Sequence, residues 1–229
     1  MQAVDEFRQR LSAAELALLA GLDKPVKIQA FIDSEIPYSL EDTDRCPLRV
    51  VRDRIGHCLD GALFAAAALR LIGHPPLLLQ LLPSDQDDDH MVAVYKAFDC
   101  WGAVGQSNYV GLRYREPVYR SLRELVMSYF EVFFNSNGER TLLGYRRPVN
   151  LKVYDPLGWM WNDAAIPKFL QDLGRKPGIR VVTPSQQASL SLVDERSRQA
   201  GVIGANPAGL FQPGGPKPEY ACFPQEARP

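Results

Sequence analysis

The chain has few of the residues from which metal centres and disulfide frameworks are built. Its 229 residues include only four cysteines and three histidines. No two cysteines form a Cys-x-x-Cys pair and the histidines are not clustered, so neither a zinc site nor a network of disulfides is expected. This thiol content suits a reducing compartment, and we expect a cytoplasmic protein that needs no metal and no other cofactor.

The chain also lacks a long hydrophobic run and an excess of charge of one sign. Its longest weakly polar stretch, Leu59 to Leu69, contains Asp60 and is too short to span a bilayer. The first residues do not show the basic and then apolar order of a secretory signal. The net charge is −1, and the basic residues are spread along the chain. We therefore expect neither a membrane nor a nucleic acid as partner, and the oligomeric state stays open.

What the chain does have is apolar material for one ordinary domain. Hydrophobic residues make up 46% of the sequence, and single domains commonly hold about 100–200 residues. From about Pro184 onward the composition shifts to Ser, Gln, Gly and Pro, which is typical of segments that bury no core. We expect a domain over residues 1–180 and a poorly ordered tail over 181–229.

Hydrophobic periodicity and turn residues predict a mixture of helices and short strands, and thus an α+β fold. The expected helices cover residues 5–20, 26–36, 56–73, 121–134 and 166–173. The expected strands cover residues 77–82, 90–98, 101–109 and 151–154. Between the first two strands, the acidic run 85–89 is expected to be a solvated loop rather than a metal site.

The helix expected from Gly56 to Gly73 differs from the others. It is rich in alanine and apolar nearly all round, and the turn Gly73-His74-Pro75-Pro76 is a strong stop signal. A helix of this kind is buried at the centre of a domain. Cys58 falls in its first turn.

The first turn of a buried helix favours a reactive thiol at Cys58. A thiol attacks a carbonyl group as the thiolate, so its pKa has to fall from about 8.5. Unpaired N–H groups and the macrodipole at a helix start favour negative charge and can bind the oxyanion of a tetrahedral intermediate. Gly56 leaves room for a substrate backbone. A single cysteine on an apolar helix is more often an inert core residue, and it is the position of Cys58 that favours the catalytic interpretation.

Such a thiol needs a histidine as base, and three histidines are available. His57 is adjacent to Cys58, and consecutive helix positions diverge by about 100°, so its side chain is expected to point away. His74 lies past the far end of a helix about 15 residues long, roughly 22 Å from the thiol. His90, which opens a strand, is therefore the expected base.

Two runs of the sequence resemble the transglutaminase-like superfamily. The run from Gly56 to Leu63, Gly-His-Cys-Leu-Asp-Gly-Ala-Leu, resembles its nucleophile helix. The run from His90 to Tyr95 resembles its histidine strand, and Trp101 resembles the tryptophan that opens the next strand. The superfamily includes transglutaminases, bacterial cysteine proteases, peptide N-glycanases and, more distantly, arylamine N-acetyltransferases. The resemblance covers about residues 25–110 and implies a papain-like fold, in which the cysteine helix packs on an antiparallel sheet.

The chain departs from the superfamily at the residue that would orient the histidine. An aspartate is usual about four residues after the tryptophan, and here that position is Gly105. Asp99, in the hairpin turn, lies roughly 25–30 Å along the strand from His90, at about 3.3 Å per residue, and cannot reach its ring.

The register of the hairpin offers substitutes for the missing aspartate. A three-residue hairpin loop would place Asn108 opposite His90 with Gln106 beside it, whereas a two-residue loop would bring Ser107 opposite His90. Asp155, on a later segment, is a further candidate. Asn108 is our first choice, since an asparagine can hold the imidazole in papain-like sites.

The resemblance implies thiol-dependent acyl transfer or hydrolysis at an amide or ester carbonyl, as in a cysteine protease, an amidase or an acyltransferase. In this interpretation Cys58 is the nucleophile, His90 the base and Asn108 the residue that holds the imidazole. The expected partner is a peptide, a protein or a small amide. The alternative is a catalytically inactive peptide-binding module on the same fold.

Overall fold

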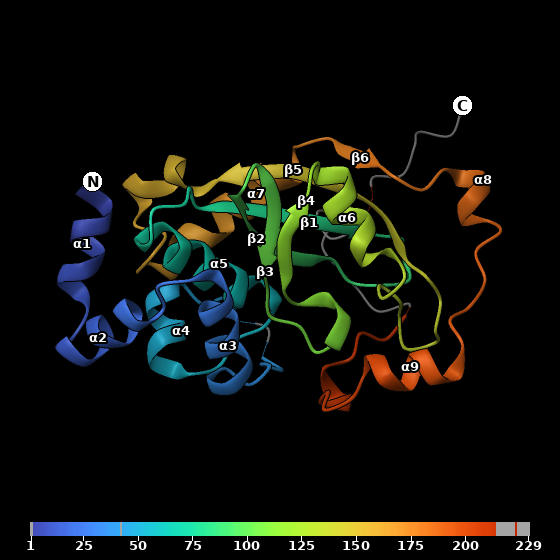
Figure 1. Ribbon diagram of the computed structural model, residues 1–229, viewed down its shortest axis with the longest axis horizontal. Helices are drawn as coiled ribbons and strands as arrows, with labels where there is room; N and C mark the ends of the chain where they lie inside the picture. The colour runs from blue at the N-terminus through green and yellow to red at the C-terminus, as the bar shows by residue number, and fades with distance from the viewer. Residues whose placement is uncertain (1, 42, 214–222, 224–229) are drawn as a thin grey trace.

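Along the chain, a group of helices precedes the first strand, and further helices lie between and after the strands of a single sheet (Figure 1). The computed structural model describes residues 2–41, 43–213 and 223. The α-helices are α1 (Gln2–Arg10), α2 (Ala13–Gly21), α3 (Pro25–Glu35), α4 (Pro47–Asp53), α5 (Cys58–Leu71), α6 (Leu122–Phe130), α7 (Ile166–Gly174), α8 (Pro184–Gln187) and α9 (Glu195–Gly201). The 3-10 helices are η1 (Val110–Leu112), η2 (Leu151–Leu157), η3 (Asp163–Ala165) and η4 (Pro207–Gly209).

The described residues form one six-stranded antiparallel sheet in the order β4-β3-β2-β1-β5-β6. The strands are β1 (Leu77–Pro83), β2 (His90–Ala97), β3 (Cys100–Val104), β4 (Arg115–Tyr119), β5 (Leu142–Asn150) and β6 (Gly178–Arg180). Helices α1 to α5 gather at one end of the molecule, whereas α6, α8 and α9 lie toward the other end (Figure 1). The fold is α+β, with the cysteine-bearing helix packed on an antiparallel sheet, as the sequence predicted.

The two faces of the sheet bury separate hydrophobic clusters. Side chains alternate along β2, so that Met91, Ala93 and Tyr95 join the cluster around α5, while Val92 and Val94 join the cluster around α6. Helix α5 is buried from Leu59 to Leu69, as its composition predicted, and contacts α3, α4 and β2. A helix buried on all sides fixes where its first turn meets the sheet.

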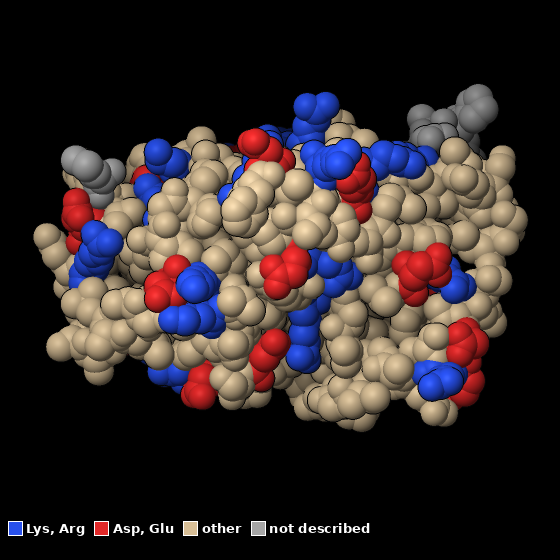
Figure 2. Space-filling model, viewed as in Figure 1, with Lys and Arg blue, Asp and Glu red and all other residues tan. Residues whose placement is uncertain are grey.

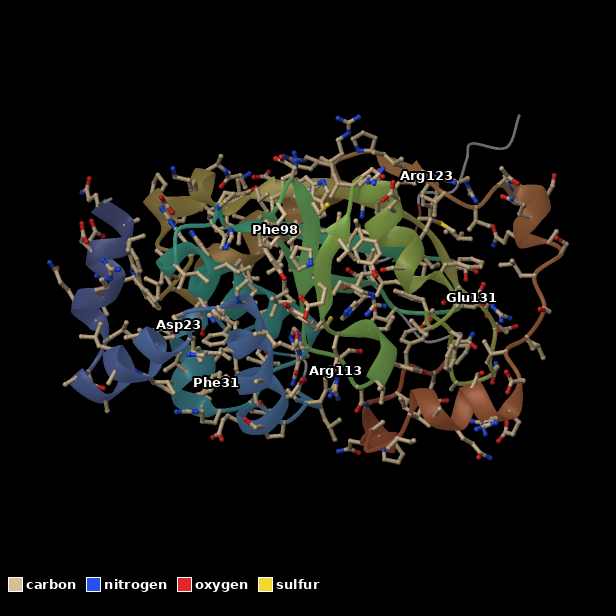
Figure 3. All side chains as sticks on the ribbon, viewed as in Figure 1. Asp23, Phe31, Phe98, Arg113, Arg123 and Glu131 are labelled. Carbon is tan, nitrogen blue, oxygen red and sulfur yellow. The ribbon has the colours of Figure 1, made fainter. Side chains whose placement is uncertain are left out.

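The hairpin between β2 and β3 has a two-residue loop. Ala97 pairs with Cys100, and the loop residues Phe98 and Asp99 both have positive φ, at 53° and 59°. These angles suit the tight turn that matches strand twist. Phe98, at the tip, is 92% exposed (Figure 3). The three-residue loop that would have set Asn108 opposite His90 is therefore not formed.

Strand β3 is shorter than predicted because a helix side chain takes over its backbone hydrogen bonds. The side-chain amide of Gln29, on α3, accepts from the N–H of Gly105 at 3.0 Å and donates to the carbonyl of Gly105 at 2.9 Å. The chain leaves the sheet at this point. Arg113 (Figure 3) then ties the following loop to α3 through Asp33, at 3.3 Å.

Two other predicted elements differ from the structure. The helix expected over residues 5–20 is two helices, because Ser12 and Glu15 form a capping box that starts α2: the Ser12 hydroxyl accepts from the Glu15 N–H, and the Glu15 carboxylate accepts from the Ser12 N–H. The strand expected over 151–154 is part of η2, and the preceding residues form β5, which the sequence analysis missed. The predicted strands at β1 and β2 and the helix at α7 are confirmed.

The described part of the segment expected to be a poorly ordered tail is folded onto the domain. Residues 181–213 contain α8 and α9, which are capped by Thr183 and Asp194. Val193 is buried, and its N–H donates to the carbonyl of Gly138 at 2.9 Å. A few apolar residues therefore suffice to hold a mostly polar segment in place. The remainder of that prediction, at 214–222 and 224–229, falls outside the described residues.

Charged side chains of both signs are interspersed on the face of the molecule shown in Figure 2. Several of them form pairs one helical turn apart, such as Lys27 with Asp23 at 2.9 Å and Arg49 with Asp53 at 3.0 Å. None of the helices formed by the described residues is long and apolar enough to cross a membrane.

Replacing Gly61 by Ala is expected to lower the free energy of unfolding by about 1–3 kcal/mol, the usual cost of overpacking. A Cβ on Gly61 would lie 2.2 Å from the Cβ of Gln106, where α5 passes the chain that has just left β3. Urea unfolding followed by circular dichroism measures the change. The matched control is Gly21→Ala, where an added Cβ meets nothing within 4 Å. Equal stability of the two variants would contradict this close approach.

Candidate active site

The first turn of α5 is held by reciprocal capping. His57 is the N-cap residue, with φ −93° and ψ −170°, and its ring nitrogen Nδ1 accepts from the Leu59 N–H at 3.3 Å. The Asp60 carboxylate accepts from the His57 N–H at 3.1 Å. The two side chains thus satisfy N–H groups that a helix start would leave unpaired, and Cys58 lies between them.

Asp60 is a fully buried carboxylate that joins this turn to the preceding loop. It accepts from the N–H of Arg45 at 2.7 Å and pairs with the guanidinium of Arg45 at 3.4 Å. Gly56 is needed beside it, since a Cβ there would lie 2.9 Å from the Cβ of Asp60. Burial raises the pKa of Asp60, and the positive charges of His57 and Arg45 oppose this shift.

The imidazole of His57 is close enough to the Cys58 thiol to lower its pKa through hydrogen bonding and charge. Its sulfur also lies 4.0 Å from the carbonyl oxygen of Asp89. Burial raises the pKa of Cys58, the hydrogen bond and charge of His57 lower it, and the carboxylates of Asp89 and Asp88 raise it, with a net increase. Any thiolate here depends on His57 to offset its burial.

Two carboxylates keep the His57 ring charged. Its Nε2 atom lies 3.3 Å from Asp44 Oδ1 and 3.5 Å from Asp60 Oδ1. Burial alone would lower the pKa of His57, but the hydrogen bonds with Asp44 and Cys58 and the negative charges of Cys58 and Asp60 raise it to about 10. The charged form of His57 is therefore favoured at neutral pH, and in that form Nδ1 cannot accept from the Leu59 N–H.

The expectation that His57 points away from Cys58 is wrong. That expectation applied the 100° spacing of helix positions to both residues. His57 is the N-cap, however, and its extended backbone turns its side chain back over the first turn of the helix. The signal that could have revealed this is His57-x-x-Asp60, which has the spacing of a capping box.

His90 lies at the start of β2, with its ring on the side of the sheet that carries α6. Its Nε2 atom lies 2.6 Å from the carbonyl oxygen of Leu112, and the ring packs edge-on against Phe133, with the centroids 6.5 Å apart. Burial and the charge of Arg115 lower the pKa of His90 to about 4, against the hydrogen bond to Leu112. His90 is thus a neutral imidazole, which donates to a backbone carbonyl.

The polar atoms of the Asn108 side chain bond to Asn206 rather than to His90. Its Nδ2 atom donates to the carbonyl of Asn206 at 2.8 Å, and its Oδ1 atom accepts from the N–H of Asn206 at 2.9 Å. The residue expected to hold the imidazole instead holds the backbone of the chain that follows α9.

The other candidates for the third residue also have partners of their own. Gln106 donates to the carbonyl of Ile36 at 2.6 Å, and the Ser107 hydroxyl accepts from the N–H of Tyr109 at 3.0 Å. Among the described interactions, neither side chain bonds to His90.

Asp155 lies at the wrong end of α5. Its carboxylate binds the guanidinium of Arg70 at 2.6 and 2.7 Å and accepts from Trp159 at 3.0 Å. Arg70 is twelve residues beyond Cys58 in the chain, roughly 18 Å along the helix at 1.5 Å per residue. Asp155 therefore fixes the C-terminal end of the helix, opposite to the thiol.

The acidic run 85–89 is not simply a solvated loop. Asp87 is buried and accepts from the Thr141 hydroxyl at 2.5 Å, and half-buried Asp89 accepts from Gln80 at 2.6 Å. Burial and the charge of neighbouring Asp88 raise the pKa of Asp89 to about 8. These contacts anchor the start of β2 beside Cys58.

Cys58 and His90 line the same cavity, which has a volume of about 380 Å³. Its wall also includes His57 and Tyr38, and on the far side the segment Ala208–Phe211. The Tyr38 hydroxyl lies against the backbone of Cys58, and its pKa is raised far above its ordinary value by burial and by the negative charge of Cys58. A hydroxyl and a helix N–H are thus brought together next to the thiol.

Asp44, His57 and Asp60 are the described group whose potential metal ligands lie closest to one another, within 4.8 Å. Their hydrogen bonds to Arg45, to Cys58 and to the start of α5 account for this grouping without an ion. We therefore assign the group to holding the imidazolium.

Replacing His57 by Gln is expected to slow alkylation of Cys58 by iodoacetamide several-fold at pH 8. The imidazolium lowers the pKa of the thiol, so its loss raises that pKa. The alkylation rate of the variant should then increase at a higher pH than that of the wild type. Mass spectrometry of Cys58 over a pH series measures this. His74→Gln is the matched control, because His74 packs edge-on against Tyr95 beyond the other end of α5. Identical pH profiles for the two variants would contradict the role of His57.

The sequence matches no protein-family model and no curated protein. Among solved structures, the chain is similar to EGTA-treated LapG of Legionella pneumophila, with a TM-score of 0.38 and 14% sequence identity. The similarity covers 73% of this chain and 95% of the LapG chain. At this level it carries no conclusion about function, which has to be inferred from the site itself.

Proposed function

We propose that the chain is a thiol-dependent enzyme that transfers or hydrolyses an acyl group at an amide or ester carbonyl. One observation carries the proposal. Cys58 begins a buried helix, opens onto a cavity, and lies beside an imidazole whose charged form two carboxylates favour. Thiolate, helix N-terminus and imidazolium together form the usual arrangement for nucleophilic attack by a cysteine.

The reaction would begin when the Cys58 thiolate attacks the carbonyl carbon and the carbonyl oxygen takes up the negative charge. The N–H of Cys58 and the Tyr38 hydroxyl would donate to this oxygen. Collapse of the intermediate breaks the bond to the amine or alcohol, which leaves with a proton from His57 and a thioester on Cys58. Water or an amine then attacks the thioester and returns a proton to His57, restoring thiolate and imidazolium.

His57 is the proton carrier that the contacts favour, and His90 is the one that the resemblance to the transglutaminase-like superfamily favours. His57 bonds to the thiol, and as an imidazolium it can protonate a leaving group. His90 lines the same cavity as a neutral ring, and its Nε2 atom is engaged by Leu112. A catalytic base at His90 would have to act through Nδ1.

The alternative is a binding module without catalysis, in which the cavity holds a peptide. The observation that favours it is the net increase in the pKa of Cys58, which disfavours the thiolate in the resting protein. The use of Asn108 to hold a backbone segment rather than an imidazole favours it too.

Incubation with p-nitrophenyl acetate is expected to release p-nitrophenol and to add one acetyl group to Cys58, which intact-mass spectrometry and peptide mapping detect. Cys58→Ser should abolish acetylation at this position and reduce turnover by several orders of magnitude, because a neutral hydroxyl is a far weaker nucleophile. Cys100→Ser is the control, since Cys100 lies in the distant β2–β3 hairpin.

The same assay shows which histidine transfers the proton. A loss of about 10²–10⁴-fold in His57→Gln, with His90→Gln near wild type, would assign the proton transfer to His57. The reverse result would assign it to His90. If the wild-type protein gains no acetyl group on Cys58, the enzyme proposal is wrong, and the binding module is favoured instead.

A further inference from the structure

The chain that follows α9 returns to the cavity that contains Cys58. Residues Ala208–Phe211 form part of the wall of the cavity that His57 and Cys58 also line. Helix α9 contacts η1, so the returning segment is delivered to the cavity from a helix already packed on the domain. A site proposed for peptide or amide chemistry thus already has a peptide beside its thiol.

Asn108 holds this segment by its backbone. The side-chain amide donates to the carbonyl and accepts from the N–H of the same residue, Asn206, at 2.8 and 2.9 Å. These are the two hydrogen bonds that an adjacent strand would make, and they require no particular side chain at the residue that is held. Asn108 is itself only 6% exposed, so the amide is presented from a rigid wall.

The feature that would select among peptides lies three residues further along the segment, where Gly209 fits closely against its neighbours. A Cβ on Gly209 would lie 2.7 Å from Leu40 Cδ2 and 3.0 Å from Asn108 Nδ2, and 3.5 Å from a ring carbon of Tyr38. An alanine at this position would require the half-exposed side chain of Leu40 to move, and a larger side chain such as leucine would also press on Asn108. The next residue, Leu210, packs against the hydrophobic cluster around α6.

We propose that Asn108, Leu40 and Tyr38 form a peptide-binding subsite, which accepts a backbone with glycine three residues after the residue that Asn108 holds. In this chain the subsite is occupied by its own segment Asn206–Phe211, which shields Cys58. The identification of such peptides as substrates depends on the thiol chemistry proposed above, whereas their binding does not.

The occupied subsite implies competition. The segment is attached to the domain, so its effective concentration at Asn108 is high, and a peptide added in solution has to displace it. A single substitution that weakens the segment should therefore expose both the subsite and the thiol.

The test uses the full-length chain with Gly209→Leu, and the probe is a bulky maleimide that reports access to Cys58. We expect modification of Cys58 to become several-fold faster than in the wild type. The matched control Gly21→Leu makes the same change where an added Cβ meets nothing within 4 Å, and it should leave the rate unchanged. Thermal unfolding by circular dichroism checks that each variant is folded.

A second variant guards against misfolding of Gly209→Leu. Asn108→Asp keeps the size of the side chain, but it replaces the donor to the Asn206 carbonyl by an oxygen and should also speed modification. The synthetic peptide Ala-Asn-Pro-Ala-Gly-Leu-Phe-Gln, the sequence of 205–212, should restore protection of Cys58 in Gly209→Leu. The same peptide with leucine in place of glycine should not.

Equal rates in the wild type and both site variants would overturn the proposal. Protection of Cys58 by neither peptide would also overturn it, because the segment would then only pack against the domain. Protection by both peptides would overturn the requirement for glycine. The readout is access to the thiol and requires no turnover. A failure of the p-nitrophenyl acetate assay in both the wild type and Gly209→Leu, with a positive result here, would leave the subsite standing and remove only the enzyme.

Discussion

The rest of the site depends on the hydrogen bonds and the ion pairs of the buried Asp60 carboxylate. It binds the backbone and guanidinium of Arg45, caps the N–H of His57 and lies against the ring of His57. Arg45 is only 3% exposed, so removing Asp60 would leave a buried cation without its buried partner, a strongly destabilising change. One side chain thus fixes the preceding loop, the first turn of α5 and the orientation of the imidazole at Cys58.

The reactivity of Cys58 is a balance between burial and charge. A half-buried sulfur beside Asp88 and Asp89 would keep its proton, and the imidazolium of His57 opposes this effect. The imidazolium in turn requires Asp44 and Asp60, since burial alone would discharge it. The nucleophile therefore depends on charges two contacts away, and substitutions in the loop that holds Asp44 act on the thiol through His57.

Local sequence signals predicted what depends on local structure. The buried helix α5, the strands β1 and β2 and the place of Cys58 follow from composition, periodicity and stop signals. The partners of Cys58 do not, because the conformation of an N-cap decides where His57 points. No described residue of β3 faces His90, because the strand ends at Val104 and Gln29 takes the backbone hydrogen bonds of Gly105. Asn108 lines the cavity, but the partner of its side chain lies 98 residues away in a segment whose polar composition predicted a poorly ordered tail.

The two histidines, the thiol and the returning segment are linked by a continuous series of contacts. The segment is held by Asn108, and α9 before it contacts η1. Leu112 of η1 accepts the hydrogen bond of the His90 ring, and the carbonyl of Asp89, which precedes His90, lies beside the sulfur of Cys58. The segment held by Asn108, the η1 residue Leu112 and the first turn of α5 therefore line one cavity. The returning segment is in this sense a part of the site rather than an appendage to the domain.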